Sequence, residues 1–141
     1  MSLISCSGKR PSNLGVSDSE FAPCPSSPNC VSSDASASDP RHHISPFQLD
    51  AKQKEIWQTI RETVMEMPRT RIIDETADYL HAECTSALLG FVDDLELHHR
   101  SDENLIAIRS ASRLGSSDLG VNRKRVETLR DLLINRGIVL K

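Results

Sequence analysis

Apolar side chains recur at helical spacing in the segment that follows Pro46. Proline at positions 46 and 68 brackets this segment, since proline is excluded from a helix interior. Asp50 and Gln53 fit a capping box, in which two side chains satisfy free amides at a helix start. The pattern therefore predicts a first helix that begins near Asp50. Its inward-facing residues would be Ile56, Trp57, Ile60, Val64 and Met67.

A second helix is predicted close to the C-terminus, over about Arg123 to Arg136. Gly137 is a typical residue to end a helix, and Arg130 and Arg136 lie near the negative end of the helix dipole. Its inward-facing residues would be Val126, Leu129, Leu132 and Leu133.

Between these helices, polar and apolar residues alternate with a period of two, which is typical of antiparallel strands with one buried face. The predicted strands are Arg71 to Glu75, Tyr79 to Thr85, Phe91 to His99 and Leu105 to Arg113. Helices segregated from a run of antiparallel strands indicate an α+β fold. We therefore expect a four-stranded antiparallel sheet with an N-terminal and a C-terminal helix packed on one face.

The turns between the strands predict which residues pair. A turn over residues 87–90 gives these pairs: Leu80 with Leu97, Ala82 with Leu95, and Glu83 with Asp94. A tight turn at Ser101 and Asp102 gives these pairs: Leu97 with Ile106, Leu95 with Ile108, and Asp94 with Arg109. A one-residue slip would invert every face, so the apolar pairs support this register.

A polar row of Glu83, Asp94 and Arg109 follows from that register. One interpretation is a cross-strand ion pair on a solvated sheet, worth about 0.2–1 kcal/mol. A second is the floor of a polar pocket. A third is an acid/base pair formed by the two carboxylates.

The first 40 residues have a loop-forming composition, with 12 Ser, 5 Pro and 2 Gly. Such a segment buries little apolar surface. It predicts a Ser/Pro-rich extended arm over residues 1–45, followed by a single α+β domain over 46–141. The chain has 141 residues, a net charge of −3 and no long apolar run, which argues against a membrane-spanning protein and against a basic nucleic-acid binder.

Residues 109–125 contain five cations and one anion in an otherwise acidic chain. Some of these cations lie in the first turn of the last helix. The positive end of the helix dipole disfavours each cation there by about 0.3–1 kcal/mol. A Gly/Ser loop, helix-start amides and nearby Arg side chains are what an anion site requires. We expect Arg109, Arg113 and Arg123 to converge there. The other candidate residues are Ser112, Asp118 and Asn122, with Glu83 and Asp94 beneath them.

The alternative for this segment is that carboxylates neutralise the cations within the fold. The candidates for that role are Asp118, Glu127 and Glu83. No Cys or His spacing typical of a metal site occurs, and no serine has a His and acid partner. We therefore assign no catalytic residue, no metal and no cofactor.

The residues from Leu3 to Cys6 have the form of a bacterial lipobox, which predicts lipid attachment at Cys6. By analogy with lipoprotein sorting, Ser7 after the cysteine favours the outer membrane. Export would permit a disulfide, and the Pro-rich loop from Cys24 to Cys30 brings that pair close. The alternative is free thiols in a cytosolic protein. Cys84 lies on an apolar alternating face and is expected to be a buried core thiol.

Three blocks of sequence resemble an uncharacterised family catalogued as domain of unknown function 1499. They are Leu14-Gly15-Val16 with Pro23 to Ser33, then Glu83 to Asp94, then Arg109 to Arg125. The resemblance implies an exported or lipid-anchored bacterial protein, with plastid relatives, and it supplies no reaction. We therefore expect a periplasm-facing envelope lipoprotein that binds an anionic ligand or a protein partner. The alternatives are an enzyme acting on an anionic envelope metabolite through Glu83 or Asp94, and a purely structural envelope protein.

Overall fold

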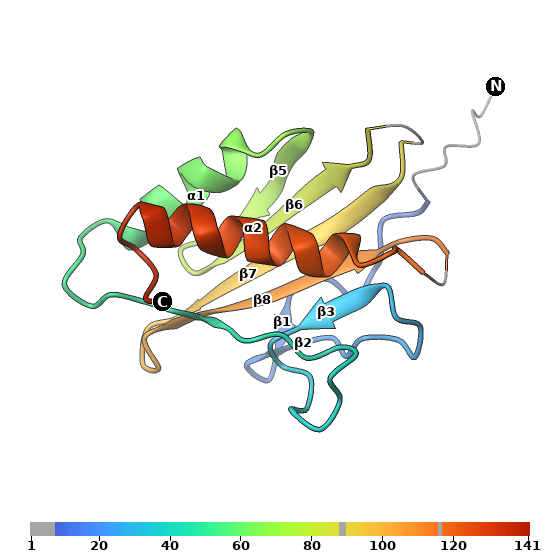
Figure 1. Ribbon diagram of the computed structural model, residues 1–141, viewed down its shortest axis with the longest axis horizontal. Helices are drawn as coiled ribbons and strands as arrows, with labels where there is room; N and C mark the ends of the chain where they lie inside the picture. Colours follow the sequence, from blue (N-terminus) through green and yellow to red (C-terminus); the bar gives the residue numbers. More distant parts are fainter. Residues whose placement is uncertain (1–7, 88–89, 116) are drawn as a thin grey trace.

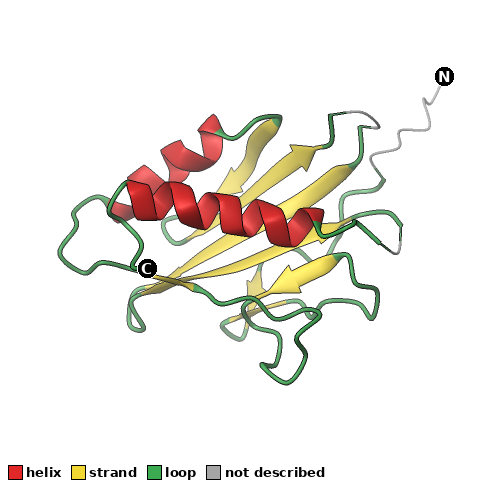
Figure 2. Cartoon of the chain, in the orientation of Figure 1, coloured by secondary structure: helices red, strands yellow, loops and turns green. Residues whose placement is uncertain are grey.

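The computed structural model describes residues 8–87, 90–115 and 117–141, so the predicted lipid-attachment residue Cys6 lies outside the described residues. The helices are α1 (Ile56–Glu66) and α2 (Val121–Asn135). The strands are β1 (Val16–Ser17), β2 (Glu20–Phe21), β3 (Cys30–Ser32), β4 (Phe47–Gln48), β5 (Thr70–Glu75), β6 (Tyr79–Thr85), β7 (Val92–Arg100) and β8 (Leu105–Ser112). Both helices lie over one face of the main sheet (Figures 1 and 2).

The main sheet has six strands, so the prediction of a four-stranded sheet was wrong. The predicted strands correspond to β5–β8, which are consecutive antiparallel neighbours. The additional strands β3 and β4 both pair with β8 and extend the sheet with residues from either side of position 45. They have three and two residues, too few to show an alternating pattern. A separate two-stranded sheet, β1–β2, lies nearer the N-terminus.

The two helices differ in how closely they follow the prediction. α2 lies within two residues of the predicted range at both ends. α1, in contrast, begins at Ile56, after Glu55 in a left-handed conformation, with no side-chain cap. Asp50 instead accepts a hydrogen bond from the Lys52 amide in a turn, so the capping box is not formed. Neither helix among the described residues is long and apolar enough to cross a bilayer. The largest fully buried core residues include Phe47, Leu49, Ile60, Leu80, Leu95, Leu97, Ile106, Ile108, Leu129 and Leu133.

The predicted strand register is confirmed in the β6–β7 hairpin and is wrong in the β7–β8 hairpin. Leu80 pairs with Leu97 across β6 and β7, as predicted. Across β7 and β8, however, Leu97 pairs with Ile108 rather than with Ile106. The cause is a longer turn over residues 101–104, in which Asn104 has a φ of 55°. A shift of two residues keeps every side chain on its face, so the hydrophobic pattern fits both registers.

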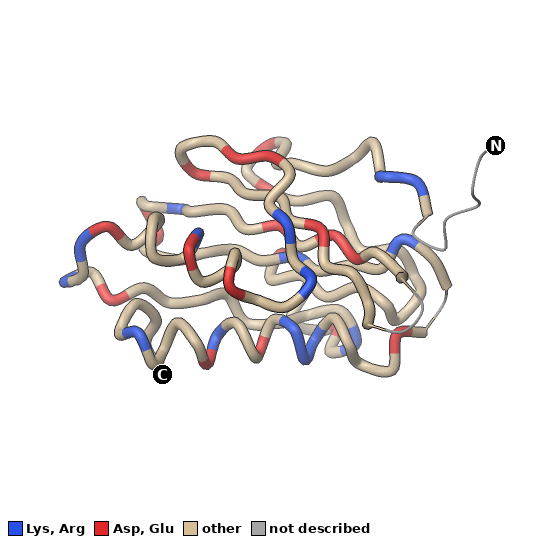
Figure 3. Tube along the Cα trace, turned by 90° about the horizontal axis from the view of Figure 1, so that it is seen from above, with Lys and Arg blue, Asp and Glu red and all other residues tan. Residues whose placement is uncertain are grey.

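The N-terminal segment packs across the sheet face that the helices leave uncovered. Arg109 on β8 donates to the carbonyl oxygens of Ala22 and Pro23, and Glu96 on β7 accepts from the Gly15 amide. Viewed at right angles to Figure 1, α2 lies on one side of the strands and the N-terminal segment on the other (Figure 3). The face predicted to be polar is therefore buried. The Cys24–Cys30 disulfide is confirmed, and so is the buried free thiol of Cys84.

Candidate functional site

A charged cluster lies between β6, β7 and the end of β8. It is on the sheet face that the N-terminal segment covers, which we call the covered face. Asp94 is only 1% exposed. Both of its oxygens accept hydrogen bonds from Arg113, over 2.9 Å from Nε and 2.8 Å from Nη2. The Nε2 atom of His81 lies 2.7 Å from Asp94 Oδ1. The bidentate geometry fixes the Arg113 guanidinium in the plane of the carboxylate, which is the strongest form of this ion pair.

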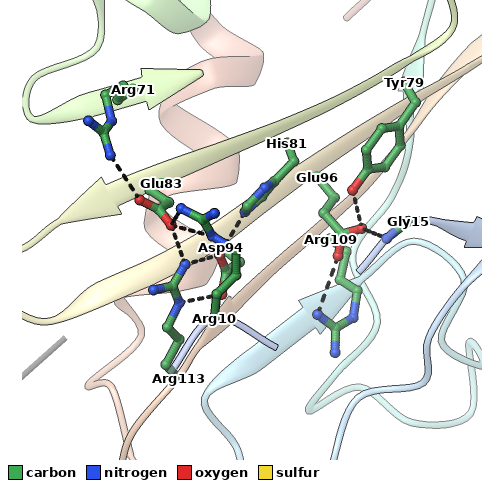
Figure 4. Close-up of polar contacts among 10 residues, drawn as sticks. All are labelled: Arg10, Gly15, Arg71, Tyr79, His81, Glu83, Asp94, Glu96, Arg109 and Arg113. Carbon is green, nitrogen blue, oxygen red and sulfur yellow. Dashed lines mark hydrogen bonds and ion pairs between the residues drawn. The ribbon is translucent and has the colours of Figure 1, made fainter. Parts of the chain in front are cut away.

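Glu83 joins this cluster from the neighbouring position on β6. Its Oε2 atom accepts from Arg113 Nη2 over 2.5 Å and from Arg10 Nη2 over 2.7 Å. Arg71 on β5 lies 3.6 Å from the other oxygen. Three arginines from three different segments thus converge on two carboxylates (Figure 4).

The pKa values of both carboxyls are shifted downward. Burial alone would raise the pKa of Asp94, but hydrogen bonds from Arg113 and His81 outweigh it and hold that pKa below its ordinary value. Burial is likewise outweighed at Glu83, where Arg113 and Arg10 lower the pKa. Neither carboxyl is therefore suited to act as a general acid near neutral pH.

The same cluster has the composition of a metal site. Candidate ligand atoms of His81, Glu83 and Asp94 lie within 4.8 Å of one another. Yet both Asp94 oxygens and one Glu83 oxygen already accept from arginines. A cation would have to displace guanidinium groups that neutralise the site, so the donor set fits an internal ion-pair network better than a metal.

We expect the free energy of unfolding to fall as the pH drops below about 4. Asp34, Glu83, Asp94 and Asp118 all have lowered pKa values in the fold. A lowered pKa stabilises the fold above the unfolded-state pKa, and that stabilisation is lost as the pH falls through the folded-state value. Urea unfolding at pH 7, 5, 4 and 3 measures this. An unchanged midpoint from pH 5 to pH 3 would contradict it.

A second buried group of polar residues surrounds Glu96. Its Oε2 atom accepts from the Tyr79 hydroxyl over 2.7 Å and from the Gly15 amide over 2.8 Å. Arg109 Nη1 lies 3.6 Å from Glu96 Oε1 (Figure 4). The predicted Asp94–Arg109 pair is therefore not formed. Arg109 faces Glu96, and Arg113 takes its place at Asp94 because of the two-residue register shift.

The start of α2 lies on the other side of the sheet, where Asp118 fills the position expected for a bound anion. Its carboxylate accepts from the amides of Gly120 and Asn122, each over 2.9 Å. Burial would raise the pKa of Asp118, but these hydrogen bonds outweigh it and lower the pKa. The amides of Gly120 and Asn122, which an external anion could use, are thus satisfied within the chain.

Asn122, which is fully buried, connects α2 to β8 and to the disulfide loop. Its Oδ1 atom accepts from Ser110 Oγ and Arg125 Nη1. Its Nδ2 atom donates to Asp118 Oδ2, to Ser112 Oγ and to the carbonyl oxygen of Asn29. Sequence analysis identified Asn122, Ser112 and Asp118 as ligand contacts, whereas the structure shows them bonded to one another.

The three arginines predicted to converge are held apart. Arg109 and Arg113 lie on the covered face, while Arg123 donates to the carbonyl oxygens of Pro40, Arg41 and His43. Basic and acidic positions are intermixed along the chain (Figure 3). Of the proposed neutralising carboxylates, Glu83 pairs with Arg113, whereas Glu127 pairs with Arg130, which lies outside the basic segment. The Glu83–Arg113 pair favours the interpretation in which cations of the segment are neutralised within the fold.

A cleft of about 260 Å³ lies beside the start of α2, between the ends of β7 and β8. Its apolar lining includes Phe91, Leu114 and Val121, which are all exposed. Ser112, Asp93 and Asp118 supply polar atoms, and Asp93 is paired with Arg125 over 2.7 Å. Sequence reasoning missed the apolar residues of this site. The available signal was the presence of large aliphatic residues within a Gly/Ser loop.

Comparison with known proteins yields one match. A family model described as a protein of unknown function (DUF1499) matches residues 20–133. The chain belongs to the DUF1499 family. The matched region begins at β2 and ends within α2, so it contains the cleft and both buried charge clusters except for their contacts from Arg10 and Gly15. No curated protein and no solved structure matches this DUF1499 protein significantly.

Proposed function

We propose that this DUF1499 protein is an exported, lipid-anchored binding module of the bacterial cell envelope. In this proposal the cleft beside α2 receives an apolar group of the partner. The observation that carries it is the contrast between two regions. Arg113, Glu83 and Asp94 are paired with one another inside the fold, whereas the apolar lining of the cleft is exposed.

Two features support export and anchoring. The tetrad that ends at Cys6 has the form of a lipobox, and the chain after it has the Ser/Pro-rich composition of a tether. The Cys24–Cys30 disulfide is compatible with an oxidising compartment such as the periplasm. Lipid attachment at Cys6 would then hold the domain at the outer membrane.

The ion pairs of the covered face support a non-catalytic role. An enzyme that used Glu83 or Asp94 would need at least one of these groups to be accessible to a substrate. Asp94 is buried under the N-terminal segment, and Arg113 engages both carboxylates. The exposed cleft offers contact area, and the titratable groups in its described lining, Asp93 and Asp118, both have partners within the chain.

Val121→Glu is expected to reduce binding of the apolar fluorophore N-phenyl-1-naphthylamine several-fold. The new carboxylate would lie in the apolar lining of the cleft, while an acidic residue in the first turn is favourable for a helix. The matched control is Leu140→Glu, which places the same charge at an exposed residue beyond the other end of α2. Fluorescence titration measures both. Equal binding by the two variants would contradict the cleft as the binding site.

Cys6→Ser is expected to release the protein from the membrane fraction, because the lipid would lose its attachment atom. The measurement is fractionation of cells that express the full-length precursor, with Cys84→Ser as the control because that thiol is buried in the core. Unchanged membrane association of Cys6→Ser would overturn the anchoring part of the proposal.

A further inference from the structure

Exposed apolar side chains gather at one edge of the domain. Six large apolar residues are exposed in the described part of the chain, and four of them lie around the cleft or in its adjoining loop. We call these four the apolar rim: Phe91, Leu114, Leu119 and Val121. Contiguous exposed apolar surface on a small domain marks a contact site for a protein or a membrane.

Leu119 is the most unusual member of the apolar rim. Leu119 is 95% exposed, and its φ of 56° is in the left-handed region that bulky residues rarely adopt. Asp118 and Gly120 on either side are bonded to each other, since the Gly120 amide donates to the Asp118 carboxylate. The loop therefore presents a leucine to solvent from a backbone that is held in place.

The described chain begins at the same edge. A Cβ atom built on Gly8 would stand 2.9 Å from Leu114 Cγ and 3.0 Å from Arg113 Cβ, so Gly8 packs against the apolar rim. Figure 1 shows the start of the described chain and the loop after β8 at the same end of the sheet. Cys6 precedes Gly8 by two residues, which span at most about 7 Å when fully extended.

We propose that the apolar rim rests on the lipid surface to which the protein is anchored, with Leu119 inserted among the acyl chains. This inference rests on the proposed lipid attachment at Cys6, because an anchor so close to Gly8 brings this edge to the bilayer. A single lipid chain binds membranes weakly, and a second apolar or basic contact makes the attachment stable.

Charge at this edge fits an anionic lipid surface. Lys9 adjoins Gly8 and is exposed. Lys124 is exposed as well and lies one helical turn after Val121, on the same side of α2. The nearest carboxylates have internal partners, since Asp118 caps α2 and Asp93 pairs with Arg125. With the apolar rim on the bilayer, the cleft that it borders would face the lipid, so its ligand would be an amphiphile drawn from the membrane.

In the test, the Cys6 thiol is coupled to a maleimide lipid in vesicles that contain phosphatidylglycerol. Cys6 is the reactive thiol because Cys24 and Cys30 are bonded and Cys84 is buried. Leu119→Trp and Leu140→Trp are compared in a Trp57→Phe background, with brominated acyl chains as the quencher. Leu140 is also exposed and is the next-to-last residue. Figure 1 shows the C-terminus near the end of α2 that is away from the loop after β8.

We expect the tryptophan at 119 to be quenched several-fold more strongly than the one at 140. Equal quenching, or stronger quenching at 140, would overturn the inference. A blue shift at 119 without vesicles that grows with protein concentration would also overturn it, because a second copy would then cover the apolar rim. The chemical tether makes this result independent of whether cells acylate Cys6, which the fractionation of Cys6→Ser tests separately.

Discussion

Replacing Arg113 with methionine is expected to lower the free energy of unfolding by about 3–5 kcal/mol, the usual cost of removing one partner from a buried ion pair. Arg113 is the only residue that donates to both Asp94 and Glu83 among the contacts described for this cluster. Without it, His81 is the one remaining partner of Asp94 among the described side chains, and Asp94 is almost fully buried. The folded protein must then either hold an unpaired buried carboxylate at Asp94 or bind a proton there.

The measurement is urea unfolding at pH 7, with Arg71→Met as the matched control. Arg71 reaches the same cluster at 3.6 Å, but its side chain is 77% exposed, so its loss should cost less than about 1 kcal/mol. Arg113→Lys should fall between the two because it keeps the charge and loses the bidentate geometry. Similar unfolding midpoints for Arg113→Met and Arg71→Met would show that the cluster does not stabilise the fold.

Asn122→Ala is expected to destabilise the protein by on the order of 3 kcal/mol, since buried polar groups left without partners cost about 1–3 kcal/mol each. The side chain of Asn122 bonds Ser110 and Ser112 on β8 and the carbonyl oxygen of Asn29 in the disulfide loop. Its removal takes the Asn122 Nδ2 donor away from Ser112 Oγ, and it takes one of two partners from Ser110 Oγ and from the Asn29 carbonyl oxygen, which keep Arg125 Nη1 and the Ser112 amide. It also removes hydrogen bonds that link the start of α2 to β8.

Asn135→Ala is the matched control for this prediction. It makes the same substitution at the other end of α2, where Asn135 is exposed, and surface changes of this kind stay within about 0.5 kcal/mol. Thermal unfolding followed by circular dichroism compares the two variants. Equal melting temperatures would contradict the structural role assigned to Asn122.

The strands β5–β8 could be predicted because each combines alternation with enough length to show it. Tyr79–Thr85 matches its predicted range at both ends. Loop length, in contrast, could not be predicted from alternation. Moving Leu97 from Ile106 to Ile108 changes no face of the sheet, yet it exchanges the arginine that meets Asp94. A shift of two residues therefore decided which side chains form the buried cluster.

The covering of the polar face could not be predicted because it depends on long-range contacts of a segment without periodicity. Gly15 contacts Glu96, and Arg10 contacts Glu83, across more than 70 residues of chain. A Ser/Pro-rich composition indicates an extended path but does not indicate where that path runs. The basic segment was open to two interpretations for the same reason, since the partners of Arg123 are backbone carbonyls at residues 40–43.

These assignments change where binding is to be sought. The arginines that suggested an anion site have partners inside the fold, and the amides at the start of α2 are capped by Asp118. The exposed surface beside them is apolar, along Phe91, Leu114 and Val121. We therefore propose that the buried charges of this domain stabilise its fold, whereas the cleft and the apolar rim bind its partner.

The most direct test is a map of amide chemical shifts in the isotope-labelled protein during titration with dihexanoyl phosphatidylglycerol, kept below its critical micelle concentration. This probe carries both an anionic head group and apolar chains, so it can report either kind of site. We predict that the largest shift changes fall on the apolar rim, at Phe91, Leu114, Leu119 and Val121. Changes centred on Arg109, Arg113 and Arg123, with the apolar rim unaffected, would contradict the account.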